Sequence, residues 1–140
     1  MVPSLHFNMY DVGGIVWLKA SDDGAMHGSL QKLLLDELAI TDTQRDKWRN
    51  EIEADKLNAP KIVWGRVKQW LRNNEKTWLC VFDNVADPAI LRNSMVWKDL
   101  QKGVNGSGHV LISSRCSSNW PLHIKHIPLD FVSSIGNASA

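Results

Sequence analysis

The chain has 140 residues, of which 44% are hydrophobic and 22% are charged, and its formal net charge is +1. These values are typical of one soluble globular domain, and so small a net charge excludes a broad field that would attract nucleic acid or anionic lipid. No apolar run approaches the roughly 18 residues that a membrane span needs, and the first residues lack a signal-peptide pattern. We therefore expect a cytoplasmic protein without nucleic-acid or membrane partners.

The first half of the chain predicts one strand followed by three helices. A β-rich run at 14–20 lies between turn-forming residues and predicts a strand. Helices are predicted at 25–39, from a cap at 41–43 to residue 54, and from Pro60 to Asn73. The apolar residues that recur at helical spacing in the first and third of these helices are Leu30, Leu33, Leu34 and Leu38, and Val63, Val67, Trp70 and Leu71.

The second half predicts two apolar strands and a weaker third one. Strands are predicted at 78–82 and 109–114, with a loop and short helical pieces at 88–102 between them. A possible last strand at 124–129 is weaker because it contains a proline, and the tail at 133–140 has no pattern. Strands and helices thus alternate along the chain.

This alternation predicts an α/β fold, with a three-layer parallel sheet and helices on both of its faces. The strands at 78–82 and 110–112 are continuous apolar runs, which is typical of strands buried on both faces. With no internal repeat, we expect residues 1–140 to form one domain. Trp97 and Trp120 fall in predicted loops. The tryptophans expected to pack in the core are Trp17, Trp64, Trp70 and Trp78.

Polar residues follow two of the predicted strands. Asp83 and Asn84 come directly after the strand at 78–82, and Arg115 follows the strand at 109–114. Ligands of open α/β sheets bind beyond the carboxyl ends of the strands, so these residues are candidates for a functional site. A carboxylate there suits Mg²⁺ held through water, and an arginine suits a terminal phosphate. An aspartate after a strand is also a common turn former or helix cap, and that alternative stays open.

Two other kinds of site find little support in the sequence. Cys116, His123 and His126 form C-x6-H-x2-H, which offers three ligands without the spacing of structural zinc sites. No serine lies in the G-x-S-x-G turn of an α/β-hydrolase. Ser113 and Ser114 are therefore interpreted as residues at the end of a strand.

The segments 78–87 (WLCVFDNVAD) and 106–115 (GSGHVLISSR), followed by Trp120, resemble the NB-ARC domain. This domain is the nucleotide switch of the STAND class of P-loop NTPases, which includes NOD-like receptors. The resemblance covers about residues 14–129, and residues 14–20 are similar to the family's strand after the P-loop helix. It implies a P-loop NTPase-like fold, represented here in part.

The resemblance also implies roles for the three polar residues. Asp83 matches the Walker B acid, which binds Mg²⁺, usually through water. Asn84 stands where many members have a second acid that helps to orient the attacking water, so Asp83 and Asn84 are the catalytic candidates. Arg115 matches the sensor arginine for the γ-phosphate and, with Asp83, forms the nucleotide-binding candidate. The implied cofactors are ADP or ATP with Mg²⁺, and the implied partners are a second copy of the chain or signalling proteins.

One departure from the family is large, because the sequence contains no P-loop of the form G-x-x-x-x-G-K-[ST]. The backbone amides and lysine of that loop supply most of the grip on phosphate. The glycine cluster at 103–108 precedes a strand instead of opening a helix, so it cannot replace the loop. Two hypotheses follow: a partial nucleotide switch that is inactive as an ATPase on its own, or a non-catalytic α/β interaction module that has lost nucleotide binding.

Overall fold

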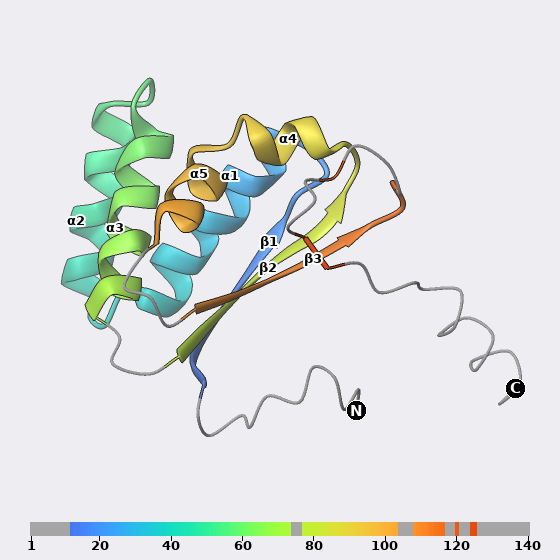
Figure 1. Cartoon of the computed structure of the whole chain (residues 1–140). Helices are drawn as coiled ribbons and strands as arrows, with labels where there is room; N and C mark the ends of the chain where they lie inside the picture. The colour runs from blue at the N-terminus through green and yellow to red at the C-terminus, as the bar shows by residue number, and fades with distance from the viewer. Residues whose placement is uncertain (1–11, 74–76, 104–107, 117–119, 121–123, 126–140) are drawn as a thin grey trace, which may run out of the picture.

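Three parallel strands form the sheet of this protein, in the order β1-β2-β3 (Figure 1). This fold is given by a computed structural model, and the described residues are 12–73, 77–103, 108–116, 120, 124 and 125. The tail at 133–140 and most of the last strand predicted at 124–129 lie outside them. Ile124 and Lys125 belong to no strand. No helix in the described part of the chain is long and apolar enough to cross a membrane.

The three strands lie close to where the sequence predicts them. They are β1 (Val12–Lys19), β2 (Thr77–Val85) and β3 (Gly108–Ser114). β2 is the central strand, and its Val81 lies opposite Trp17 of β1 and Leu111 of β3. Because all three strands run in the same direction, their carboxyl ends meet at one edge of the sheet.

β2 differs from the prediction at its carboxyl end. It continues beyond Phe82 through Asp83 and Asn84 to Val85, and its register with β3 shifts between Phe82 and Val85. Such a shift marks a bulge, which often re-aims a side chain. Asn84 has a φ of 61°, in the left-handed region that asparagine tolerates better than most residues. The two polar residues therefore lie in a bulge at the end of the strand, where the prediction placed them after it.

The first three predicted helices are also present, as α1 (Asp23–Lys32) with its continuation η2 (Leu33–Leu38), α2 (Asp42–Ala54) and α3 (Ala59–Asn73). Asp22 and Thr41 begin α1 and α2, because each side chain accepts a hydrogen bond from a backbone amide of the first turn. One difference is that the helix predicted at 25–39 ends in a π-helical segment, η2. The short helical pieces predicted at 88–102 are α4 (Pro88–Arg92) and α5 (Met95–Lys102).

In the described part of the chain, the helices lie on one side of the sheet (Figure 1). The core fills the space between these two layers, where Val16, Leu18 and Phe82 have no exposed surface. The α/β class with a parallel sheet is thus confirmed. The prediction of helices on both faces differs from what the described residues show, since a sequence pattern does not specify the face to which each helix returns.

The tryptophans test the predicted core. Trp64 and Trp78 are buried, and Trp70 is partly buried, as expected. Trp17 is 56% exposed, so the prediction that it packs in the core is wrong. Its side chain projects from β1 toward the face without helices, because alternate residues of a strand point to opposite faces. Trp97 lies in α5 instead of a loop, and its ring meets that of Phe82 edge-on in the core.

Candidate functional site

Asp83 lies at the carboxyl edge of the sheet, on the central strand. It pairs with Lys19 of β1, and its backbone carbonyl accepts a 2.8 Å hydrogen bond from the amide of Ala20. This bond fixes the ends of β1 and β2 to each other. The partly buried Asp83 side chain consequently stands between the ends of the two outer strands.

Two neighbouring side chains orient the Asp83 carboxylate. The Ser113 hydroxyl of β3 donates a 2.8 Å hydrogen bond to Oδ1 of Asp83, and it accepts a 2.8 Å bond from the Asn84 amide. The indole Nε1 of Trp17 on β1 lies 3.4 Å from Oδ2, which is long for a hydrogen bond. The carboxylate is thereby connected to both outer strands, and Ser113 is the stronger of its two partners.

Arg115 directly follows the last residue of β3, so the strands that lead to Asp83 and Arg115 are neighbours in the sheet. The ends of these strands are joined by Ser114, whose hydroxyl donates a 2.6 Å hydrogen bond to the carbonyl of Val85. The Arg115 side chain is exposed and forms no ion pair with Asp83 in the described residues. The structure thus brings the two strand ends together and leaves the guanidinium accessible.

Asn84 contributes less than its position in the sequence indicates. Its backbone amide is already used by Ser113, so that amide cannot bind a phosphate oxygen in this conformation. Its side chain is exposed and carries a neutral amide, which can orient a water molecule and is a poor base. Asn84 can therefore help to position water beside Asp83, and it cannot replace a catalytic acid.

The donor atoms at this edge fit a hydrated Mg²⁺ better than a tightly held nucleotide. Asp83 accepts bonds from two side chains, and an ionised carboxylate has about four acceptor positions, so oxygen lone pairs stay available for coordinated water. The described residues contain no cluster of three or more metal-ligating side chains of the His, Cys, Asp and Glu types. Phosphate would in addition need a row of backbone amides, and the sequence has no P-loop to provide it.

Sequence reasoning missed two residues of this site, Ser113 and Trp17. The sequence predicts Ser113 only as a strand-end residue, whereas in the structure its hydroxyl bonds to Asp83. Both residues lie on the same face of the sheet as Asp83, and that follows from period-two alternation once the strands are in register. The register was the missing information, because parallel strands far apart in the chain carry no local signal for it.

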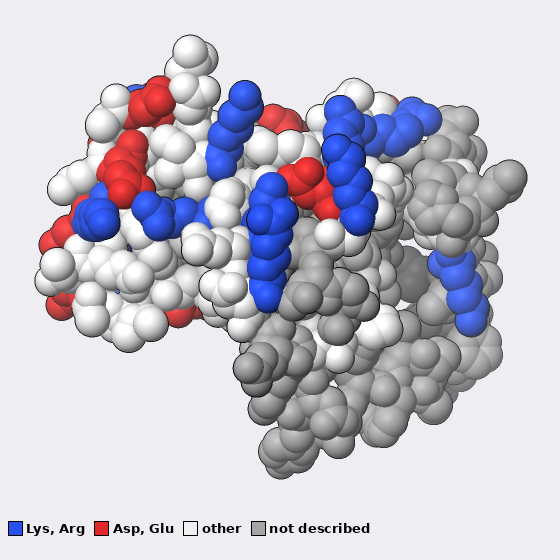
Figure 2. Space-filling view, turned by 60° about the vertical axis from the view of Figure 1, so that its left-hand side comes forward, with Lys and Arg blue, Asp and Glu red and all other residues white. Residues whose placement is uncertain are grey.

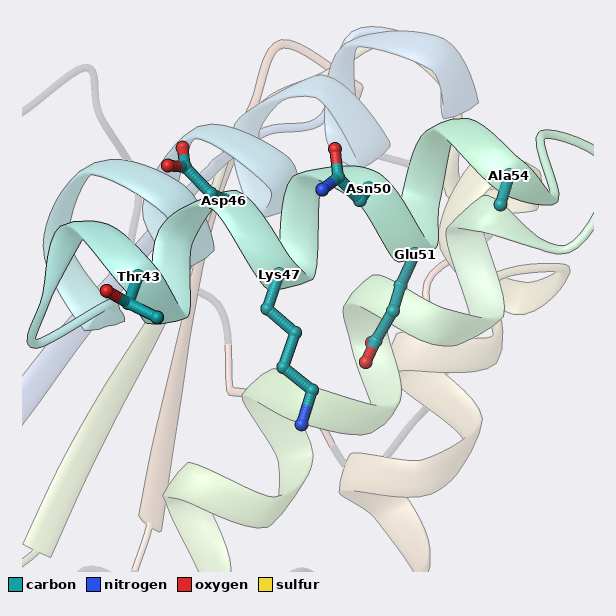
Figure 3. A pocket seen from close by; sticks show the side chains of 6 residues that line it. All are labelled: Thr43, Asp46, Lys47, Asn50, Glu51 and Ala54. Carbon is teal, nitrogen blue, oxygen red and sulfur yellow. The ribbon is translucent and has the colours of Figure 1, made fainter.

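Away from Asp83, a depression lies on the outer surface of α2, and all the side chains that line it come from that one helix (Figure 3). Lys47 and Glu51 point to one side of α2, and Asp46 and Asn50 to the other (Figure 3). Acidic and basic side chains are also interspersed on the face shown in Figure 2. Such a mixture is typical of a solvated helix surface.

Comparisons of this chain with protein-family models, with curated proteins and with solved structures gave no match. The resemblance to the NB-ARC domain therefore stays a prediction from the sequence. The geometry around Asp83 is the structural feature that bears on function.

Proposed function

We propose that this chain carries the Mg²⁺-binding strand and the sensor strand of an ADP/ATP-dependent signalling switch of the NB-ARC class. The observation that carries the proposal is the placement of Asp83 on the central strand, beside a β3 that leads directly into Arg115. The resemblance requires this neighbourhood, since the Walker B acid and the sensor arginine act on one nucleotide from adjacent strand ends. The finer fold that we propose is accordingly P-loop NTPase-like, and the expected location is the cytoplasm.

In this proposal the three residues bind and sense the nucleotide. Asp83 holds hydrated Mg²⁺, with Ser113 fixing the direction of the carboxylate. The exposed Arg115 contacts the γ-phosphate and so distinguishes ATP from ADP. Asn84 orients water without removing its proton, so the site favours nucleotide-dependent switching over rapid hydrolysis. Exchange of ADP for ATP would then promote self-association or the binding of a signalling partner.

The cation part of the proposal can be tested on the full chain with Mn²⁺, which replaces Mg²⁺ and broadens nearby amide signals in NMR spectra. Substoichiometric Mn²⁺ should first broaden the signals of Asp83, Asn84 and Ser113, and Asp83→Asn should abolish this effect. Asp87→Asn is the matched control, because asparagine keeps the helix-capping role that Asp87 has at the start of α4. Broadening centred elsewhere, or unchanged in Asp83→Asn, would contradict the role of Asp83.

The nucleotide part is tested by titrating the same sample with ADP and then with ATP, both with Mg²⁺. Without a P-loop we expect a Kd of about 1 mM or weaker, which corresponds to roughly −4 kcal/mol. ATP should shift the amide signals at the end of β3 more than ADP does, and Arg115→Ala should remove that difference. The control is Arg92→Ala in α4, another exposed arginine. Equal responses to both nucleotides in the unaltered chain would sink the sensor role.

A second candidate function is the non-catalytic α/β interaction module. The observation that favours it is the exposure of Ile15 and Trp17, 37% and 56%, on the face of the sheet without helices in the described residues. Exposed apolar patches often mark interaction sites. Gel filtration separates the two candidates. Association that depends on Mg²⁺ and nucleotide favours the switch, whereas a dimer insensitive to nucleotide favours the module.

A further inference from the structure

The outer edge of β1 has backbone groups that no other strand uses in the described part of the chain. The amide of Ala20 points to β2, because it bonds to the Asp83 carbonyl, whereas the amide of Lys19 points the opposite way. Backbone groups alternate between the two sides along a strand, so those of Ile15 and Trp17 also point away from β2. This edge is therefore a template for one further strand.

A groove with a volume of ≈ 450 Å³ runs along this edge, between β1 and the helical segments α1 and η2. Gly28 of α1 lines it, and a Cβ atom at Gly28 would contact nothing within 4 Å. The groove thus has open space above Gly28 for a side chain of a bound peptide. On the β1 side it is lined by Ile15 and Trp17, the residues whose backbone groups point away from β2.

Ser29 limits how far along β1 an added strand can form backbone hydrogen bonds. Its hydroxyl accepts a 3.0 Å hydrogen bond from the Lys19 amide and donates a 3.0 Å bond to the Ala25 carbonyl. The Lys19 amide is therefore occupied from within the chain. An added strand can pair with Ile15 and Trp17 and must leave the edge before Lys19.

The charges along the groove favour an acidic ligand. Lys19 and Lys32 both line it, and neither forms an ion pair in the described residues. One acidic side chain, Glu37, also lines the groove. The excess of positive charge is small, but it lies beside the outward-pointing backbone groups of β1. It can therefore favour peptides of one charge over those of the other.

We propose that the outer edge of β1 binds an extended peptide of alternating acidic and apolar residues, which adds to the sheet as a further strand. Its backbone pairs with Ile15 and Trp17, and one apolar side chain enters the space above Gly28. Its acidic side chains alternate to the opposite face, where Lys19 lies. The inference does not depend on nucleotide binding. It gives the interaction module a site and a class of ligand.

The first experiment titrates the full chain with a synthetic peptide of alternating glutamate and valine, seven residues long and capped at both ends, and follows amide signals by NMR. Saturable shifts should be largest at Ile15 and Trp17. A second peptide is N-methylated at the amides that would face β1. Its affinity should be at least about tenfold lower, because it loses backbone hydrogen bonds. Equal binding of the two peptides would overturn strand addition.

The second experiment compares Gly28→Gln with Gly65→Gln. Both glycines lie within helices and have open space at the Cβ position, so both variants should fold. Gly28→Gln fills the groove and should weaken binding of the glutamate–valine peptide about tenfold, whereas Gly65→Gln on α3 should leave it unchanged. Unchanged binding in Gly28→Gln would show that the peptide does not use this groove.

Two further outcomes would also overturn the proposal. A lysine–valine peptide that binds as tightly as the glutamate–valine peptide would remove the role of Lys19. A dimer in gel filtration whose Ile15 and Trp17 amide signals do not respond to the peptide would show that this edge is not open to a peptide in solution. The Mn²⁺ effects are read at Asp83, Asn84 and Ser113, whereas the peptide effects are read at Ile15 and in Gly28→Gln, which lie outside that site, so failure of one proposal is distinguishable from failure of the other.

Discussion

The two faces of the same sheet have different roles in this molecule. On the face that meets the helices, Val16 and Leu18 of β1 have no exposed surface, whereas their neighbours Ile15 and Trp17 are exposed on the other face. The residues that hold the Asp83 carboxylate, Ser113 and Trp17, also project toward that second face. For β1, the comparison indicates that the helical face supplies stability while the other face keeps Ile15 and Trp17 exposed, although their neighbour Val81 on β2 is buried.

The largest effect expected from this comparison is a difference between two truncations on one strand. Leu18→Ala should lower the free energy of unfolding by about 2–5 kcal/mol, because it leaves a cavity in the core. Trp17→Ala should lower it by less than about 1 kcal/mol, because most of that side chain is already in water. Denaturant unfolding followed by circular dichroism measures both values. A large loss in Trp17→Ala would show that both faces carry stability.

The next effect concerns Gly108, which begins β3 opposite Trp78. A Cβ atom at Gly108 would collide with the indole ring of Trp78, so Gly108→Ala should cost about 1–3 kcal/mol through overpacking. Gly65→Ala is the control, because its Cβ meets no atom and the change should stabilise α3 by up to about 1 kcal/mol. Thermal unfolding measures the stability of both variants. An increase in stability in Gly108→Ala as well as in Gly65→Ala would contradict the close contact between Gly108 and Trp78.

A smaller, pH-dependent effect is expected within the helical layer. Burial opposes ionisation of Asp99, but hydrogen bonds from Trp64 and Lys68 and the nearby charges of Lys68 and Lys102 outweigh it, so the pKa of Asp99 lies below its usual value. A lowered pKa stabilises the fold above the unfolded value of about 3.9, and this contribution is lost as pH falls through the folded pKa.

Asp99→Asn should therefore cost about 1 kcal/mol at neutral pH and lose less stability than the unaltered chain below about pH 4. Urea unfolding between pH 7 and pH 3 measures the two slopes. Asp36→Asn is the control, since Asp36 is exposed and forms no ion pair in the described residues. Parallel slopes for Asp99→Asn and the unaltered chain would show that Asp99 is not tied to α3 in solution.

The smallest effect leaves the fold unchanged and compares two thiols. Cys80 is buried on the helical face, and burial raises the pKa of its thiol, so it should not react with Ellman's reagent in the native protein. Cys116, beyond β3, is partly exposed and should react. Equal labelling of the two before unfolding would indicate that the core opens on the timescale of the assay.

The sequence was most informative where a pattern is local. Thr41 capping α2, the helical spacing of Val63 and Val67, and the apolar run of β2 all depend on neighbours in the chain, and the corresponding elements formed close to their predicted positions. The candidate site was predictable in part, because Asp83 follows a buried run.

The rest of the site depends on interactions between distant segments. Ser113 reaches Asp83 only because β2 and β3 pair in one register, and the bulge at Asn84 shifts that register. The exposure of Trp17 depends on which face of the sheet the helices cover. A single sequence carries no local signal for either choice, so the partners of Asp83 were missed.

The π-helical segment η2 bears on whether this helix can tolerate the loss of one residue. It buries three consecutive leucines, Leu33, Leu34 and Leu35, and Arg45 of α2 donates a 2.7 Å hydrogen bond to the Leu35 carbonyl. A π turn holds about one residue more than an α turn. We expect deletion of one leucine here to convert the segment to regular α-helix and leave α2 in place, so this helix should accept the loss of one residue without a change in topology.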